Sequence, residues 1–292
     1  MTGRRGNIMF DMKNQRLGVE VEMTGISRRN AARIIKEVID GSLIDIGDSY
    51  DTYKITDTYH RTWKIVLDGS IETEGRNGEA VELVSPILTY DKCKTLTKII
   101  VALKEAGAVV NNSCGIHVHV DAANHNVKSL KNLLKMFSKR ESLMTSFLEI
   151  DADRVNGFCR FVDNHIIENL DRVKDMNGLA NLWYHDCNNV EYEQRRHYSS
   201  TRYYMLNLHN VWFRGTVEFR MFNSTLEIEK IMSYIQFVLA MSARAINLKD
   251  VKKAKYNFKT EKEILSTWLS GLGLKGAEFK VCRKLFLASV TA

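Results

Sequence analysis

Apolar and polar residues alternate in several short segments of the chain, and this period of two predicts β-strands. The predicted strands are Leu17–Met23, Tyr53–Thr56, Thr62–Leu67, Glu79–Val84, Gly115–Asp121, Tyr203–His209 and Thr216–Phe222. Successive side chains of a strand point to opposite faces of a sheet, so each strand is expected to bury one face. The last two segments are expected to pair as an antiparallel hairpin.

Other segments carry apolar residues at helical spacing. Helices are predicted over Arg28–Asp40, Lys92–Ala106, Leu130–Phe137, Phe161–Val173, Ile231–Leu239 and Ile264–Leu272. Ser27 is a suitable N-cap for the first helix, and the pairs Ser224/Glu227 and Thr260/Glu263 fit capping boxes before the last two. Because these helices coexist with mostly antiparallel strands, the sequence predicts an α+β fold.

A basic, polar segment, Lys249–Lys259, divides the chain. Residues 1–248 are expected to form the main domain, and residues 249–292 a linker with a helical appendage that packs on the same domain. Within the appendage, Gly271–Gly276 matches the dinucleotide-binding pattern GxGxxG. The pattern follows a helix rather than a strand, so a helix end and a turn are expected there instead.

Composition narrows the class of protein. The chain of 292 residues is 45% hydrophobic and 26% charged, as is typical of a globular protein. Its formal charge of +7 suits an anionic partner such as a nucleotide, an acidic substrate or nucleic acid, although a solvated basic surface accounts for it equally well. The five scattered cysteines, together with no signal peptide and no membrane-spanning segment, predict a cytoplasmic protein with reduced thiols.

Acidic and imidazole side chains share faces on four of the predicted strands. These side chains are Glu20 with Glu22, Glu82, His117 with His119 and Asp121, and Glu218 with Arg220. If they gather on one sheet, the carboxylates repel one another unless cations neutralise them. The sequence therefore predicts a divalent metal site on the polar face of the sheet.

Each of these motifs also has an ordinary structural explanation. Two glutamates on one strand face are common on the solvated side of a sheet, and a His-x-His strand is often structural. Glu218 and Arg220 also fit a surface ion pair of little energetic weight. Glu72 and Glu79 lie in glycine-rich, polar surroundings and rank lower as ligands.

Taken in order, the motifs resemble those of the amidoligase family, within the superfamily of glutamine synthetase and glutamate–cysteine ligase. The matching segments are Gly18–Glu22 with Thr24 and Gly25, Trp63 with Asp68–Ser70, Glu82–Pro86, Cys114–Val120, and Arg202 and Tyr203 leading through Asn207 to Thr216–Asn223. The resemblance covers residues 17–245. It implies a glutamine synthetase-like fold, with a curved, mostly antiparallel sheet, a metal and nucleotide site on its concave face and helices on the other side.

The resemblance also implies roles for individual residues. The implied metal ligands are Glu20, Glu22, Glu82, His117 and Glu218. The implied catalytic residues are Arg220, which stabilises the transferred phosphoryl group, Glu218 and His119. The candidates for contact with the nucleotide are Arg220, Asn207, Arg154 and Arg160, and those for contact with the substrate are Asp68, Ser85 and His119.

The expected function is that of an ATP- and Mg²⁺-dependent carboxylate–amine ligase, which forms an amide through an acyl phosphate. An imidazole among the ligands also tolerates Mn²⁺. The carboxylate and amine substrates, small molecules or peptides, stay open, as do the general base and an oligomeric state. The alternative is a hydrolase that binds Zn²⁺ or Mn²⁺ through His117, His119 and carboxylates. Neither nucleic acid nor a membrane is an expected partner, because a basic binding module gains nothing from a face of glutamates.

Overall fold

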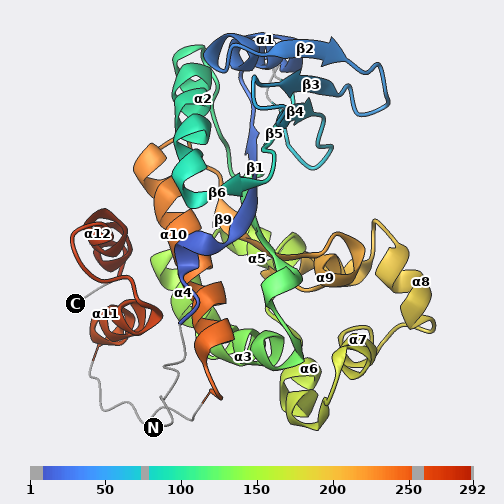
Figure 1. The fold of residues 1–292 in the computed structure, drawn as a ribbon, viewed down its shortest axis with the longest axis vertical. Coiled ribbons are helices and arrows are strands. Elements are labelled where there is room, and N and C mark those ends of the chain that lie inside the picture. The colour runs from blue at the N-terminus through green and yellow to red at the C-terminus, as the bar shows by residue number, and fades with distance from the viewer. Residues whose placement is uncertain (1–8, 74–78, 252–259, 291–292) are drawn as a thin grey trace, which may run out of the picture.

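The structure is a computed structural model that describes residues 9–73, 79–251 and 260–290. At its centre lies one open, uncurled sheet of nine strands (Figure 1). The strands are β1 (Arg16–Met23), β2 (Ser42–Asp45), β3 (Tyr53–Thr56), β4 (Thr62–Val66), β5 (Val81–Val84), β6 (Leu88–Thr89), β7 (Gly115–Asp121), β8 (Leu206–Asn207) and β9 (Thr216–Asn223). Their order is β2-β3-β4-β5-β1-β7-β9-β8, with β6 paired to β1.

Every pairing between these strands is antiparallel. The α+β fold with a mostly antiparallel sheet is therefore confirmed, whereas the pronounced curvature implied by the resemblance is not seen. The helices are α1 (Arg28–Val38), α2 (Cys93–Glu105), α3 (Val127–Ser138), α4 (Glu141–Phe147), α5 (Ala152–Gly157), α6 (Asn164–Asn169), α7 (Met176–Trp183), α8 (Val190–Arg195), α9 (His209–Phe213), α10 (Ile228–Asn247), α11 (Glu261–Leu272) and α12 (Lys280–Ala288).

One face of the sheet is apolar and is covered by helices. On β1 the side chains of Leu17, Val19, Val21 and Met23 are at most 2% exposed. They belong to the same core as the apolar side chains of α1, α2, α3 and α10, of which α1 packs on β3 and β4 and α10 packs on β7. The alternation along β1 turns Gly18, Glu20 and Glu22 to the opposite face.

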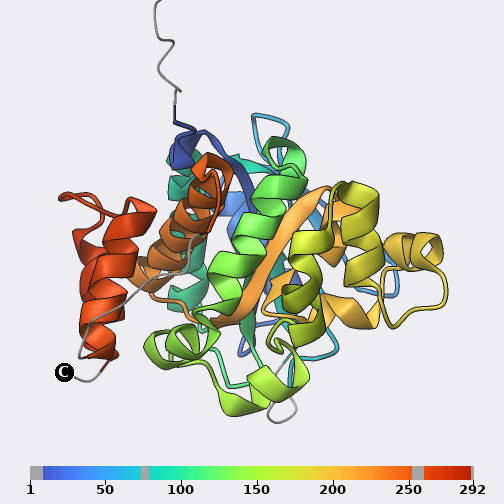
Figure 2. The same ribbon diagram turned by 90° about the horizontal axis from the view of Figure 1, so that it is seen from below.

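The C-terminal helices α11 and α12 pack on α10, as the view in Figure 2 shows. Aromatic rings join them to the core, because Phe147 lies within 6.2 Å of Phe237, Trp268 and Phe286 between ring centroids. Thr260 begins α11 with the predicted capping box, and the helix ends at Gly273 with a positive φ of 98°. The GxGxxG pattern is therefore a helix end, as expected.

Several elements differ from the prediction. The other predicted capping box, Ser224 with Glu227, is wrong. Glu227 is itself the N-cap of α10, and the Ser224 hydroxyl donates to the carbonyl of Glu22. The predicted helix Phe161–Val173 is reduced to α6 and a short 3-10 turn. The predicted strand Tyr203–His209 is only the two residues of β8, because α9 begins at His209.

Two strands were not predicted from the sequence, and both lack a clear alternation. β2 is an edge strand whose residues are mostly exposed, and β6 has only two residues.

All five cysteines are free thiols. In the described part of the chain, no helix has the length and hydrophobicity needed to cross a membrane. Residues 1–8, on which the expected absence of a signal peptide depends, and residues 252–259, most of the predicted linker, lie outside the described residues.

A buried carboxyl group on α4 predicts how stability depends on pH. Glu141 is 7% exposed, and burial raises its pKa to about 7, although the Val162 N–H donates to it at 2.8 Å. Because the folded state holds this proton more tightly than the unfolded state, stability falls as pH rises from about 4.5 to about 7. Glu141→Gln keeps the acceptor without the charge. At pH 8 we therefore expect it to raise the free energy of unfolding by roughly 1–3 kcal/mol, and with it the unfolding temperature.

Thermal unfolding at pH 5 and pH 8 checks this prediction. The gain of Glu141→Gln should nearly vanish at pH 5, where wild-type Glu141 is protonated. Glu105→Gln, an exposed position at the end of α2, is the matched control. An equal gain at both pH values would mean that the burial of charge is not the cause.

Candidate active site

The polar face of β1 is the centre of the candidate site. Its two glutamates lie two residues apart, and neighbouring strands place further ionisable groups opposite each of them. Glu20 pairs with His117 of β7, and Glu22 pairs with Glu82 of β5. Residues that are directly opposite on antiparallel strands point to the same face, so these four side chains meet above β1.

A third pair of groups comes from the strands beyond β1. His119 of β7 lies opposite Glu218 of β9, and Glu218 in turn lies opposite Asn207 of β8. Four strands that are far apart in the sequence, β1, β5, β7 and β9, therefore contribute to one cluster, and they lie side by side in the sheet (Figure 1).

An irregularity between β7 and β9 lies beside Arg220 and decides which face of the sheet Phe222 joins. Between the pairs Ile116/Phe222 and Val118/Phe219, the single residue His117 faces two residues of β9, Arg220 and Met221. Such a bulge changes which side chains point to a given face. Arg220 shares the polar face with Glu218 by ordinary alternation, and the bulge turns Phe222, which alternation would place on that face, into the core, where it has no exposed surface.

The side chains of the cluster approach one another closely. Glu20 is central. Its Oε2 lies 3.0 Å from Nδ1 of His117, and its Oε1 lies 3.3 Å from Nε2 of His119. Oε1 of Glu22 lies 3.6 Å from Nε2 of His117. Oε1 of Glu218 lies 3.9 Å from a ring nitrogen of each histidine.

Glu218 has the best-compensated charge in the cluster. It is 1% exposed, accepts hydrogen bonds from the side-chain amides of Asn207, at 2.6 Å, and of Asn210, and pairs with Arg220. Burial disfavours its ionised form, but the charges of Arg220 and the two histidines outweigh burial and hold the pKa of Glu218 at about 2. Glu218 therefore stays ionised and keeps Arg220 in place.

Glu82 is in the opposite situation. Burial raises its pKa well above the ordinary value, and the charges of Glu20, Glu22 and Asp68 raise it further. Burial likewise raises the pKa of Glu22, despite the N–H that Gly115 donates to it at 2.5 Å. This end of the cluster thus holds more negative charge than its protein neighbours neutralise.

The donor atoms present fit divalent cations. Within the cluster, three groups each offer ligand atoms within 4.8 Å of one another, namely Glu20, Glu82 and His117; Glu20, His119 and Glu218; and Glu22, Asp68 and Glu82. Carboxylate oxygens suit Mg²⁺, and a set that includes imidazole also accepts Mn²⁺. Nε2 of His119 is buried and lies 3.3 Å from Glu20 and 3.9 Å from Glu218, without hydrogen-bond geometry to any described residue, so a cation held by these carboxylates would also meet this nitrogen.

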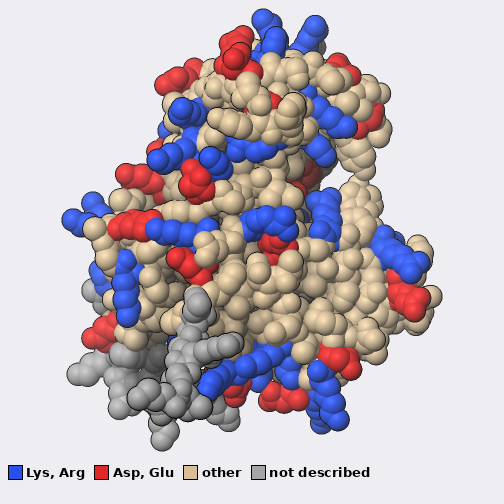
Figure 3. All heavy atoms as spheres, in the orientation of Figure 1, with Lys and Arg blue, Asp and Glu red and all other residues tan. Residues whose placement is uncertain are grey.

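The cluster forms the floor of a cavity of about 860 Å³. Its walls come from the region of β2–β5 on one side and from the chain around α8 and α9 on the other, and the molecular surface is hollowed between these parts (Figure 3). Cationic side chains line it, namely Lys54, Lys64, Arg202, Arg214 and Arg220. The rings of Phe158 and Tyr203 also line it, and Tyr50 and Tyr198 join their hydroxyls at 2.7 Å across it. Carboxylates, cations and aromatic rings thus share one space.

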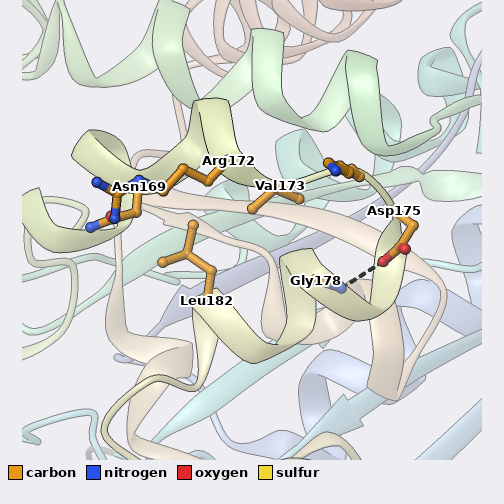
Figure 4. A pocket seen from close by; sticks show the side chains of 7 residues that line it. Asn169, Arg172, Val173, Asp175, Gly178 and Leu182 are labelled. Atoms are coloured by element: carbon orange, nitrogen blue, oxygen red, sulfur yellow. Dashed lines mark hydrogen bonds between the residues drawn. The ribbon is translucent and has the colours of Figure 1, made fainter.

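A second depression, between α6 and α7, differs in its chemistry (Figure 4). Arg172, Val173 and Leu182 line it, and its one carboxylate, Asp175, accepts the N–H of Gly178 as the cap of α7. It contains none of the clustered groups. We therefore place the candidate active site in the larger cavity.

The structure separates the remaining predicted site residues into two sets. Asp68 lines the cavity beside the cluster. The side-chain amide of Asn207 donates a hydrogen bond to Glu218, which belongs to the cluster. Arg154 is buried behind the cluster, against Gly115, and donates to the carbonyl of Ser113.

Two predicted residues lie apart from the cavity. Arg160 donates to the carbonyl of Ser200 and covers the ring of Tyr204, and it is not among the residues that line the cavity. The Ser85 hydroxyl accepts from the N–H of Val19 and donates to the carbonyl of Pro86, so it holds the backbone.

Neither of the lower-ranked acids joins the cluster. Glu79 pairs with Arg28, and Glu72 is exposed at the surface. The described metal-binding groups include neither residue.

Four residues of the site were not predicted from the sequence. Asn210 binds Glu218, and Arg214 lies 3.5 Å from Glu20 and 3.3 Å from His197. Lys54 and Lys64 line the cavity from β3 and β4. The spacing of Asn207 and Asn210 was a usable signal, but it indicates a shared site only if a helical turn begins after Asn207.

A comparison with known protein families identifies the chain. Residues 13–242 match the model of a family described as "putative amidoligase enzyme". The chain belongs to this family. The match includes all four strands of the cluster and supports an amide-bond-forming ligase, and it does not favour the metal-dependent hydrolase. No curated protein matches the chain.

The excess of negative charge around Glu82 leads to a prediction about metal binding. Adding Mg²⁺ or Mn²⁺ should raise the unfolding temperature of the wild type. At an ion concentration one hundred times the dissociation constant, the free energy of unfolding should rise by about 2.7 kcal/mol. Glu82→Gln removes both a ligand and a source of repulsion. We expect this variant to be at least as stable as the wild type without metal and to gain much less from it.

Thermal unfolding with each ion, and with a chelator, measures both effects, and Glu105→Gln again serves as the control. A full metal-induced shift in Glu82→Gln, or no shift of the wild type with either ion, would contradict the assignment of the cluster.

Proposed function

We propose that this chain is an ATP- and Mg²⁺-dependent ligase that joins a carboxylate to an amine through an acyl phosphate. One observation carries the proposal, namely the cluster of five carboxylates and two histidines next to a buried arginine on the floor of a large cavity. Membership of the amidoligase family supports the amide product. The cluster supports the use of a nucleoside triphosphate, because carboxylates can hold the metal ions that neutralise the negative charge of the phosphates.

The proposed reaction has two steps. A carboxylate oxygen of the substrate attacks the γ-phosphorus of ATP, the bond to the β-phosphate oxygen breaks, and ADP leaves. The amine nitrogen then attacks the acyl carbon, the bond to the phosphate breaks, and the amine gives up a proton. The conversion of ATP to ADP and phosphate thereby drives the formation of the amide. From a free carboxylate, this reaction is unfavourable in water.

Arg220 has the geometry for the transferred phosphoryl group. Its guanidinium is 6% exposed, is fixed by Glu218 and has an Nε that forms no hydrogen bond within the described residues. A planar guanidinium that is already held in position contacts phosphoryl oxygens with little loss of freedom. Asn207 and Asn210 act on the reaction indirectly, by holding Glu218.

The acidic residues would hold the metal ions. Glu20, Glu82 and His117 form one proposed set, and Glu22 with Asp68 extends it. Bound Mg²⁺ would neutralise phosphate oxygens and reduce repulsion between ATP and the attacking carboxylate. We propose that Nε2 of His119, which faces Glu20 and Glu218, binds a metal ion or a substrate oxygen beside them.

Nucleotide binding provides the first test. Thermal-shift measurements with ATP, ADP and a non-hydrolysable ATP analogue, each with and without Mg²⁺, should show stabilisation by the nucleotide, beyond that caused by Mg²⁺ alone, only when Mg²⁺ is present. No stabilisation of the wild type by any nucleotide with Mg²⁺ would end the ligase proposal. Stabilisation by one equivalent of Zn²⁺ without nucleotide would favour a hydrolase instead.

ADP release, measured with panels of carboxylates and amines, provides the second test. Arg220→Lys keeps the charge but loses the planar fork, so we expect ADP release to fall by about 100-fold or more. Because the cation that balances Glu218 is kept, the nucleotide-induced thermal shift should remain. Glu105→Gln is the control, and equal rates in Arg220→Lys and the wild type would refute the role of Arg220.

The acyl phosphate predicts the fate of one oxygen atom. With a carboxylate substrate labelled with a heavy oxygen isotope, one labelled oxygen should appear in the inorganic phosphate, because phosphate leaves with the oxygen that attacked ATP. Mass spectrometry of the phosphate detects it. Unlabelled phosphate would exclude this intermediate.

A further inference from the structure

Two lysines face each other across the strands at one end of the cavity. Lys54 of β3 lies directly opposite Lys64 of β4. Lys64 lies opposite Val84 of β5, which lies opposite Glu20 of β1. One row of side chains on the cavity face therefore runs from two cations, over an apolar residue, to the central carboxylate of the cluster. Two strand spacings separate Lys64 from Glu20, or roughly 10 Å along the sheet.

No ion pair with a described residue neutralises this lysine pair. Neither lysine forms an ion pair with any residue that the structure describes. The charge of Asp48 interacts with that of Lys54, but its Oδ1 accepts the N–H groups of Tyr50 and Thr52. Like charges directly opposite one another on paired strands are destabilising. An anion bound between them would remove that repulsion.

The arginine end of the cavity is different, because its cations already have partners. Arg220 pairs with Glu218, Arg214 lies against Glu20, and Arg202 covers the rings of Tyr198 and Tyr203. Arginines next to aromatic rings suit the phosphates and base of a nucleotide. The lysine end offers two unpaired ammonium groups, which suit a small anionic group.

We propose that Lys54 and Lys64 bind a second anionic group of the carboxylate substrate, so that the enzyme acts on a dianion rather than on a monocarboxylate. This inference depends on the proposed function. The reacting carboxylate lies at the acidic cluster, and the second group, a carboxylate or a phosphate, lies between the two lysines. A compact substrate of this kind spans the row over Val84, with the lysine side chains reaching towards it.

Binding measurements with matched acids test the proposal. In the presence of Mg²⁺ and a non-hydrolysable ATP analogue, glutarate should raise the unfolding temperature of the wild type more than pentanoate, which has the same chain length and one carboxylate fewer. Comparison with 4-phosphonobutyrate distinguishes a phosphate from a carboxylate as the second group. The larger shift of the two dianions identifies the preferred one.

The double variant Lys54→Gln/Lys64→Gln should lose the preference for the dianions and keep the shift caused by the nucleotide. The control is Lys36→Gln/Lys98→Gln, which removes two exposed charges on α1 and α2 and should behave as the wild type. The inference is overturned if glutarate, 4-phosphonobutyrate and pentanoate have equal effects on the wild type, including no effect. It is also overturned if the double variant loses the nucleotide-induced shift, because the lysines then bind ATP.

These outcomes are separable from failure of the proposed function. Absence of any nucleotide-induced shift in the wild type would refute the ligase itself. A normal shift with nucleotide, but no discrimination between the acids, would refute only the role of the lysine pair.

Discussion

The crowding of carboxylates on the polar face of β1 is the constraint on which the site depends. Charges removed from water are costly unless neighbours compensate them. At one end of the cluster the protein supplies that compensation, since Arg220, Asn207 and Asn210 surround Glu218. At the other end it does not, since Glu82 faces Glu20, Glu22 and Asp68. This difference divides the site into a part whose charge the protein compensates and a part for which we propose a cation.

The apolar face of the same sheet makes this arrangement possible. The buried side chains of β1 pack with those of α10 and its neighbours, so the strands are fixed by a core that is independent of the charged face. The bulge between β7 and β9 then lets Phe222 join the core although Arg220, two residues earlier, lies on the charged face. Strain and repulsion at the site are thus balanced by packing on the other side of the sheet.

Much of this arrangement follows from the sequence. Alternation predicted β1, β5, β7 and β9, and it predicted which of their side chains share a face, since the period of a strand fixes this locally. It did not predict that these strands are neighbours, because the order β5-β1-β7-β9 joins segments separated by up to about two hundred residues. Asn210 was missed because a strand was expected where α9 begins. Lys54 and Lys64 were missed because a single lysine on a strand has no distinguishing local pattern.

The lysine pair and the acidic cluster obey the same physical rule with opposite sign. Each gathers like charges on adjacent strands of one sheet face, and each is left incompletely neutralised by the protein. A folded chain that only needed stability would separate such charges, since each repulsion lowers the small margin by which the native state is favoured. The two clusters lie in one cavity, at either end of a single row. Their joint persistence is best explained by ligands of matching charge, cations at Glu20 and Glu82 and an anionic group at Lys54 and Lys64, which together describe a substrate bound with its metal ions.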